Sequence, residues 1–195
     1  AVLEAGMSDP GEIAKISELI QPTAAIITNI GHSHILAFGS REGICKEKLD
    51  IVAGMEKTNL TMPDEPLLLS ACKDTEGAVF CSVNSSEYDA YIKDVKQRDT
   101  VTDFTLCYNG KETRITLPSL GMHNVQNAML CFVSGVRLGV PEEKAAAALG
   151  GFVVEGFRQN IRQSGGITVI ADCYNASPES MNAALSVLKV SEGRR

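Results

Sequence analysis

The feature that most constrains the fold of this chain is the alternation of short apolar runs with helical patterns along its first two thirds. Ala24 to Thr28 is a short apolar run with the composition of a buried parallel strand. Before it, Ser8-Asp9-Pro10 predicts the cap and first turn of an amphipathic helix that ends at Pro22. Strands that alternate with helices in this way predict an α/β fold, with a mainly parallel sheet and flanking helices.

Similar patterns place the other elements. Val2 to Glu4 is predicted to be the end of a strand, and Pro66 to Ser70 to be another apolar strand. Asn109-Gly110 lies between two β-rich runs, which predicts a hairpin at an edge of the sheet. Further helices are predicted from Ser40 to about Met55, from about Asn124 to Leu138, from Pro141 through Ala148, and from Ser177 through Leu188.

The polar stretch from Arg158 to Gly166 is the best candidate for a domain boundary. Beyond it, Ile167 to Ala171 is predicted to be a buried strand, and the single helix that follows leaves too little chain to bury a core alone. The sequence therefore predicts one domain over residues 1–160 and the start of a second over residues 161–195. Both ends of the sequence are abrupt, so we expect the chain to be a piece of a longer protein.

Composition excludes several classes of function. The formal net charge of −6 provides no basic field for a nucleic-acid partner. No apolar run approaches the roughly 18 residues that would span a membrane, and the first residues lack the features of a signal peptide. The six cysteines are scattered without a CxxC pair, which predicts reduced core thiols in a cytoplasmic protein.

Polar residues lie at the ends of three predicted strands, at Glu4, Asn29 and Asp172. In open α/β sheets, ligands bind beyond the carboxyl ends of the strands. Each residue alone could cap a helix or close a turn. The three together favour a shared ligand site.

Lys48 falls in the middle of an apolar stripe on its predicted helix. At about 100° per residue, it shares this face with the apolar side chains of Ile44, Cys45, Ile51, Val52 and Met55. A buried ammonium is costly unless it is paired or loses its charge. Lys48 either extends its stem to the surface, or it serves a site, beside phosphates or a metal or modified so that it becomes an acid.

Two further segments carry candidate ligand groups. His32 and His34 lie in the loop after Asn29, where they are either surface residues or metal ligands. Asn124 and Asn127 are three residues apart on a helix and point to one side. Paired amides can read the donor and acceptor edge of a base, although plain helix capping is an equal alternative.

The sequence contains no phosphate-binding loop of the form GxxxxGK[ST]. Its only Gly-Lys pair is Gly110-Lys111, which lies in the predicted hairpin turn. Thr105 replaces the first glycine of the motif, and Glu112 follows the lysine. A nucleotide site in these residues would therefore lack its phosphate loop.

Five segments, in order and over nearly the whole chain, resemble the Mur ligase family. They are Leu3-Glu4-Ala5-Gly6-Met7-Ser8 with Gly11-Glu12-Ile13; Thr28-Asn29-Ile30-Gly31 with His34 and Phe38-Gly39-Ser40; Gly43-Ile44 with Lys48; Gly121 with His123-Asn124 and Asn127; and Asp172-Cys173-Tyr174-Asn175-Ala176 with Pro178, Ser180 and Met181. The resemblance implies a central ATPase domain from just beyond its phosphate loop, followed by the first strand and helix of a Rossmann-like C-terminal domain.

The resemblance also implies a reaction. This branch of the family uses ATP and Mg²⁺ to join D-alanyl-D-alanine to UDP-N-acetylmuramoyl-tripeptide through an acyl phosphate, during peptidoglycan precursor synthesis. It implies a cytoplasmic enzyme that is monomeric when intact. Without a phosphate loop, we expect the present chain to be inactive by itself.

Residue roles follow from the same resemblance. Glu4 and His34 match Mg²⁺ ligands, and Lys48 matches a lysine that the family carbamylates to steady a second Mg²⁺. The catalytic assignments are Lys48 and His34. The cofactor-binding assignments are Asn124 and Asn127, which match an adenine-contacting pair, together with Arg158 and Asp172 at the domain junction.

Several positions depart from the family pattern. Ala171 stands where a first acid is usual before Asp172, and Glu155-Gly156-Phe157-Arg158 replaces the usual Pro-Gly-Arg. Asp50 stands where Glu is common, and Leu69-Ser70-Ala71 lacks the usual Asn-Ala-Asp. These departures leave open a non-catalytic nucleotide-binding or regulatory module. A sister ligase such as folylpolyglutamate synthase is a further alternative, against which the segment from Asp172 to Met181 argues.

Overall fold

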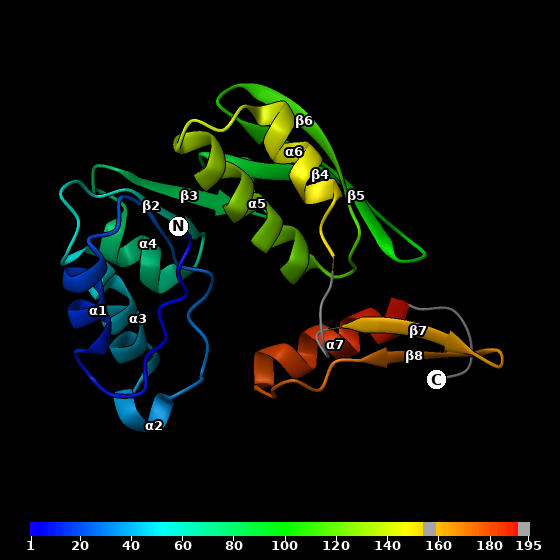
Figure 1. Ribbon diagram of the computed structural model, residues 1–195, viewed down its shortest axis with the longest axis horizontal. Coiled ribbons are helices and arrows are strands. Elements are labelled where there is room, and N and C mark those ends of the chain that lie inside the picture. The colour runs from blue at the N-terminus through cyan, green and yellow to red at the C-terminus, as the bar shows by residue number, and fades with distance from the viewer. Residues whose placement is uncertain (154–158, 191–195) are drawn as a thin grey trace.

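The computed structural model describes residues 1–153 and 159–190. Its main part is one six-stranded sheet in the order β1-β2-β3-β4-β5-β6 (Figure 1). The strands are β1 (Ala25–Ile26), β2 (Leu60–Pro63), β3 (Ala78–Ser82), β4 (Ala90–Arg98), β5 (Val101–Tyr108) and β6 (Lys111–Leu117). The pairs from β1 to β4 are parallel, and β4, β5 and β6 pair antiparallel. The sheet is therefore mainly parallel at one end, as the α/β pattern predicts.

Helices pack on this sheet around two apolar cores. The first core joins β3 to β6 with α5 and α6, and it is centred on Met129, Leu130 and Phe132. The second joins β1 to β3 with α1, α3 and α4, and it includes Ile44 and Leu68. The helices are α1 (Glu12–Ile20), α2 (Ile35–Phe38), α3 (Arg41–Leu49) followed by a 3-10 turn (Asp50–Val52), α4 (Pro66–Cys72), α5 (Met122–Arg137) and α6 (Glu142–Gly150).

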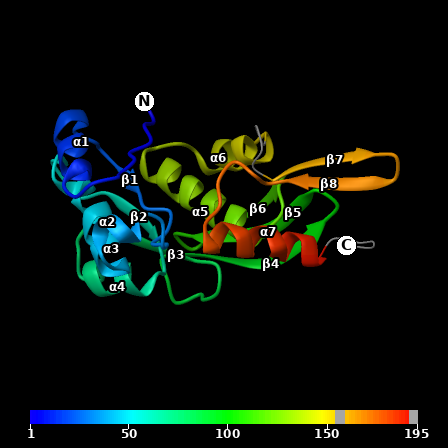
Figure 2. The same cartoon turned by 90° about the horizontal axis from the view of Figure 1, so that it is seen from below.

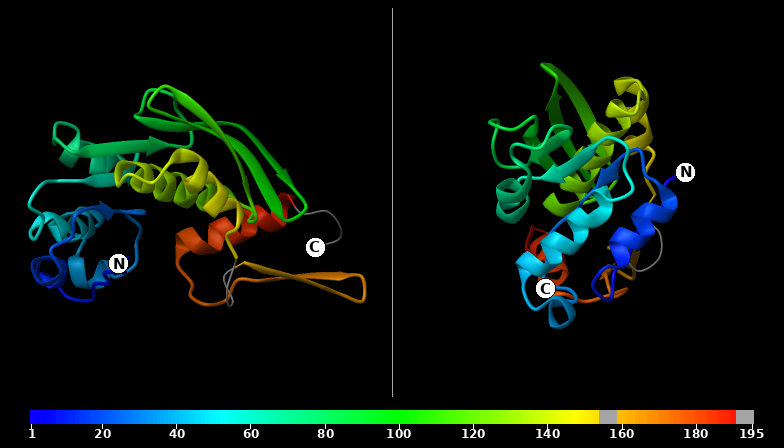
Figure 3. Two further views of the ribbon diagram at one scale, coloured as in Figure 1. Left: turned by 45° about the horizontal axis from the view of Figure 1, so that its top comes forward. Right: turned by 90° about the vertical axis from the view of Figure 1, so that its left-hand side faces the viewer.

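The residues after the predicted boundary form a separate small unit. It consists of β7 (Asn160–Ser164), β8 (Ile167–Ala171) and α7 (Pro178–Val190). The β7–β8 hairpin projects away from the six-stranded sheet (Figure 2 and Figure 3). The helix α7 lies beside the first turn of α5, because Val187 is 1% exposed and packs close to Gly121.

Several predicted elements are confirmed. Asn109 and Gly110 both have positive φ, and they connect β5 to the edge strand β6. The Ser40 hydroxyl accepts a hydrogen bond of 3.1 Å from the Gly43 amide and caps α3. At the start of α7, the Ser177 and Ser180 side chains cap each other's main-chain amides. Pro141 directly precedes α6.

Three strand predictions are wrong: one segment has no regular structure, one is a helix, and one is an exposed strand instead of a buried one. Val2 to Glu4 forms no strand, because these residues are exposed and pair with no neighbouring chain among the described residues. Pro66 to Ser70 is helical, since the Glu65 carboxylate accepts from the Leu67 and Leu68 amides and caps α4. Ile167 to Ala171 is an exposed strand that pairs antiparallel with β7, instead of a buried strand.

Two predictions about caps and thiols also need correction. Ser8 does not cap α1, because the residue that directly precedes this helix is Gly11, with φ 83°. The Ser8 and Asp9 amides donate instead to the Glu12 carboxylate. Four of the six cysteines are buried free thiols, whereas Cys131 and Cys173 are exposed.

In residues 1–153 and 159–190, no helix is both long enough and apolar enough to cross a membrane.

Candidate functional site

The helix α3 presents Lys48 to the loop after β1. Ile44 and Cys45 are buried on the same helix, so Lys48 lies on its inward face, as the helical spacing predicts. The Lys48 Nζ atom donates to the main-chain oxygen of Asn29 at 2.8 Å and lies 3.5 Å from the Asn29 side-chain oxygen. Burial lowers the pKa of the Lys48 ammonium, while Cys45 opposes this shift. Lys48 therefore reaches one of the predicted strand-end residues.

The neighbouring residue, Glu47, fixes α3 against α1. Its side chain is 5% exposed, and its carboxylate accepts from the Gly11 amide at 2.8 Å and from the Ile13 amide at 3.0 Å. A carboxylate at a helix N-terminus meets both unpaired amides and the positive end of the helix dipole. Sequence reasoning missed this contact, although an acid next to Lys48 on a partly apolar helix was a possible signal.

The loop after Asn29 is held by a residue of the small C-terminal unit. The Glu179 carboxylate accepts from the His32 amide at 3.1 Å and also contacts the His32 ring at Nδ1. Gly31 suits this close approach, since a β-carbon there would lie 3.3 Å from the Glu179 carboxyl carbon. The His32 hydrogen bond holds the pKa of Glu179 below its ordinary range. His32 therefore joins the two units, although it was not among the assigned site residues.

The predicted metal ligands Glu4 and His34 are both exposed. His34 has φ 65° and precedes the short helix α2, and Glu4 lies in the N-terminal segment without regular structure. Among the residues that the structure describes, no three His, Cys, Asp or Glu side chains form a group that could hold a metal ion. A metal at Glu4 and His34 would therefore need further donors, such as phosphate oxygens or a carboxylate made from Lys48.

The start of α5 carries the predicted amide pair. Asn124 is half-buried, whereas Asn127 is exposed. The NH₂ group of Asn124 donates hydrogen bonds to oxygen atoms of the chain. Between them, Gln126 Nε2 donates to the main-chain oxygen of Thr28 at 3.2 Å. That bond ties the first turn of α5 to the end of β1, which brings the amide pair to the same edge of the sheet as Asn29.

The Asp172 carboxylate lies close enough to His123 on α5 to affect its pKa. Burial lowers the pKa of His123, and the Asp172 carboxylate opposes that shift. Gly121 has φ 91°, and a β-carbon there would lie 2.6 Å from Cε1 of His123 and 3.2 Å from Val187. The first turn of α5 is therefore in contact with the C-terminal unit. The remaining predicted residue, Arg158, lies outside the described residues.

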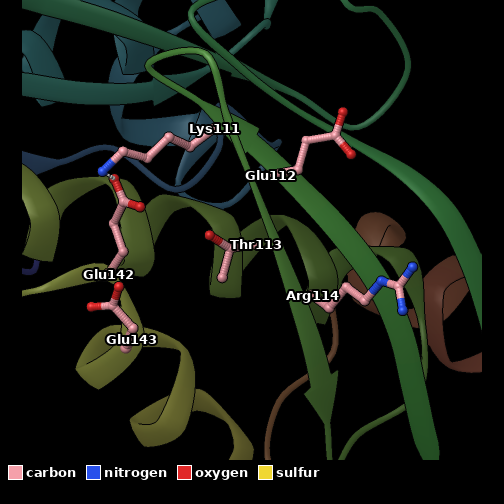
Figure 4. Close-up of a pocket in the computed structure, with 6 residues that line it drawn as sticks. All are labelled: Lys111, Glu112, Thr113, Arg114, Glu142 and Glu143. Carbon is pink, nitrogen blue, oxygen red and sulfur yellow. Dashed lines mark hydrogen bonds and ion pairs between the residues drawn. The ribbon is translucent and has the colours of Figure 1, made fainter.

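These contacts gather four sequence-distant segments at one junction: the loop of residues 29–34, Lys48 on α3, the first turn of α5, and the C-terminal unit at Asp172 and Glu179. A shallow hollow elsewhere is unrelated to this junction. It lies between β6 and α6, and Figure 4 shows Lys111 there pointing to Glu142, with which it pairs at 3.3 Å. Its lining is of mixed charge: Lys111, Glu112, Thr113, Arg114, Glu142 and Glu143.

The sequence model of the family described as Mur ligase middle domain matches residues 1–135. The chain belongs to the Mur ligase family. It is 41% identical over 200 aligned positions to a UDP-N-acetylmuramoyl-tripeptide–D-alanyl-D-alanine ligase of Bacillus subtilis (strain 168), which covers 99% of this chain. It is 31% identical to the Haemophilus influenzae ligase of the same name, over 97% of this chain.

Solved Mur ligase structures share the fold. The crystal structure of MurF from Acinetobacter baumannii superposes with a TM-score of 0.90 at 30% identity, over 99% of this chain and 43% of that one. MurF from Thermotoga maritima, solved in complex with ADP, superposes with a TM-score of 0.89 at 23% identity, over 99% and 45%. The present chain spans 42% of the length of both the Bacillus and the Haemophilus ligase.

Proposed function

We propose that this chain is the central part of an ATP-dependent amide ligase that adds D-alanyl-D-alanine to UDP-N-acetylmuramoyl-tripeptide. The observation that carries the proposal is the junction itself. Lys48 at Asn29, Gln126 at Thr28, His32 at Glu179 and His123 near Asp172 bring the predicted site segments to one edge of the sheet. That edge is where open α/β sheets bind their ligands.

The ATP would bind between the two units. Asn127, exposed on α5, and Asn124 in the turn before it suit contacts to the edge of a base. Arg158 and Asp172 are proposed to reach the nucleotide from the C-terminal side. The phosphate-binding loop is proposed to come from the remainder of a longer protein, since these 195 residues contain no GxxxxGK[ST]. These residues alone are then expected to be inactive.

Glu4, His34 and a carbamate on Lys48 are proposed to hold Mg²⁺, which would neutralise charge on the transferring phosphoryl group. The donor set suits that ion in part: Glu4 supplies a carboxylate, and phosphate oxygens would complete a shell that the described side chains leave open. Lys48 is held by Asn29 on the inner face of α3, which orients its amine toward the strand ends.

The reaction proceeds in two steps. An oxygen of the tripeptide carboxylate attacks the γ-phosphorus of ATP, forming an acyl phosphate and releasing ADP. The amine of D-alanyl-D-alanine then attacks the acyl carbon and loses a proton, and inorganic phosphate leaves with one oxygen of the original carboxylate. Residues of this chain contribute by positioning and charge stabilisation, which account for most of the catalysis in phosphoryl transfer.

Two further readings remain as outcomes of the test. A regulatory module would keep the junction without catalysis, as the departures at Ala171 and Leu69-Ser70-Ala71 allow. A sister ligase would accept a different amine. We also include in the proposal a cytoplasmic, monomeric full-length enzyme with no nucleic-acid partner and no membrane insertion.

The test is a ligation assay on the full-length protein that contains this chain. Purified protein is given ATP, Mg²⁺, UDP-N-acetylmuramoyl-tripeptide and one amine at a time: D-alanyl-D-alanine, D-alanine, L-glutamate or diaminopimelate. We expect phosphate release and a new amide with D-alanyl-D-alanine alone. A parallel reaction contains a folate in place of the UDP-sugar. Glutamate addition to that folate, or ligation of one of the other amines, would identify a sister ligase, and binding of ATP without any ligation would identify a regulatory module.

A further inference from the structure

The Asn124 side chain is the centre of a polar network at the junction between the two units. Its Nδ2 atom lies 2.8 Å from the Ser119 hydroxyl, 2.8 Å from the main-chain oxygen of Leu120 and 3.0 Å from Oε1 of Gln159. The Ser119 hydroxyl also donates to the same Gln159 oxygen at 3.3 Å. Gln159 lies 35 residues away along the chain and directly precedes β7. The network therefore links the start of α5 to the residue that leads into the C-terminal unit.

This network fixes which way the Asn124 amide faces. The main-chain oxygen of Leu120 can only accept, so the atom that faces it must be the NH₂ nitrogen of Asn124. The two hydrogens of that nitrogen are shared among three acceptors, which leaves it no capacity to donate elsewhere. The Asn124 carbonyl oxygen is the atom that remains for a ligand.

Both side-chain partners of Asn124 are themselves restrained. Ser119 is 5% exposed, and its main-chain oxygen accepts from the Thr102 hydroxyl on β5 at 2.7 Å. Gln159 is 6% exposed and has φ 53°, a left-handed backbone that only local structure can maintain. Positions as restrained as these keep a hydrogen-bonding group in one orientation.

Gln159 has one group that the network does not use. Its Nε2 atom is buried and has no hydrogen-bond partner in the part of the chain that the structure describes. Buried amide groups without a partner are rare in native proteins, so Gln159 Nε2 calls for an acceptor beyond the described residues. A nucleotide seated at Asn124 would offer such acceptors.

We propose that Gln159 and Ser119 are positioning residues for base recognition, because they hold the Asn124 amide so that its carbonyl oxygen faces the 6-amino group of adenine. This inference rests on the proposed function, since it requires an adenine nucleotide at the start of α5. A base with an oxygen at position 6 presents an acceptor there and is disfavoured. The preference for an adenine nucleotide, which belongs to the proposed function, would therefore depend on these two residues that contact Asn124.

The test compares ADP with IDP, whose bases differ at position 6, in the full-length ligase that contains this chain. Dissociation constants are measured by calorimetry for the wild type, Gln159→Leu, Ser119→Ala and the control Gln163→Leu. Gln163 is exposed on β7, so this control makes the same change in the strand that follows Gln159. The readout is the ratio of the two dissociation constants, which a general loss of stability does not change.

We expect the preference for ADP over IDP to fall about tenfold in Gln159→Leu and in Ser119→Ala, because each variant loses the free energy of about one well-oriented hydrogen bond. Gln163→Leu keeps the wild-type ratio. If Gln159→Leu does not fold, Ser119→Ala decides. A wild-type ratio in the decisive variant, or a wild type that binds ADP and IDP equally, overturns the inference and leaves the proposed ligase intact. A wild type that binds neither nucleotide overturns both.

Discussion

The Nζ atom of Lys48 lies 2.8 Å from the main-chain oxygen of Asn29, across the gap between α3 and the end of β1. An amine on an otherwise apolar helix face has no structural need to be there, since burial disfavours its charge. Its position beside the end of β1 suits the proposed role of Lys48 as a metal-binding carbamate.

Replacing Lys48 with alanine in the full-length ligase is expected to lower kcat by about 100-fold or more, because a charge-stabilising group of the site is lost. If the lysine acts as a carbamate, bicarbonate or another small carboxylate should restore part of the activity. Lys46→Ala is the matched control, since Lys46 is exposed on the same helix. Unchanged turnover in Lys48→Ala would rule out the carbamate role.

Glu47→Gln is expected to destabilise the fold by about 1–3 kcal/mol, because a neutral amide can accept from only one of the two α1 amides and leaves the other buried. The free energy of unfolding in urea measures this. Glu18→Gln, at an exposed position of α1, is the control and should change little. Equal stability of the two variants would show that Glu47 does not secure α1.

His123 should titrate below its ordinary pKa of 6.5, because burial disfavours the charged ring. The unfolded chain regains the ordinary value, so between the two pKa values the unfolded state binds more protons. The contribution of the neutral His123 ring to the free energy of unfolding is therefore fully present above about pH 6.5. It is lost as the pH falls through the folded-state pKa. Proton NMR of the His123 ring follows this directly.

Asp172→Asn supplies the control for His123, because it removes the carboxylate that opposes the shift. The pKa of His123 should then fall further. A pKa of His123 at or above 6.5 in the wild type contradicts the dominant effect of burial, and a value that Asp172→Asn leaves unchanged contradicts the proximity of these two residues.

Glu179→Ala should release the loop of residues 29–34 from the C-terminal unit, since Glu179 accepts from both the His32 amide and its ring. Amide hydrogen exchange at His32 is expected to accelerate about tenfold, as befits the loss of one hydrogen bond of ordinary strength. Glu143→Ala, exposed on α6, is the control. Unchanged exchange at His32 would mean that the contact does not hold the loop in solution.

Sequence patterns predicted those parts of the fold that depend on local chemistry. The hairpin at Asn109-Gly110 needs two adjacent residues with positive φ, and the Ser40 cap needs one hydroxyl. Lys48 was placed on the inner face of α3 by helical spacing alone. Pro66 to Ser70 was misassigned because a short apolar run does not distinguish a buried strand from a buried helix.

Contacts between residues far apart in the chain could not be predicted from the sequence. Glu47 caps a helix 36 residues earlier, Glu179 reaches His32 across 147 residues, and Gln159 reaches Asn124 across 35. Nothing in the local sequence identifies such a partner, because the packing of other elements decides the approach. The β7 strand was missed because its residues are mainly polar and, among the described strands, it pairs with β8 alone.

The most direct test of the ligase proposal follows the oxygen atoms of the tripeptide carboxylate. The full-length protein is given UDP-N-acetylmuramoyl-tripeptide labelled with ¹⁸O at its terminal carboxylate, together with ATP, Mg²⁺ and D-alanyl-D-alanine. Mass spectrometry of the released inorganic phosphate should find one ¹⁸O atom per amide formed, since the acyl phosphate passes one carboxylate oxygen to the leaving phosphate. Amide formation with unlabelled phosphate, or phosphate release that needs no D-alanyl-D-alanine, would contradict the proposal.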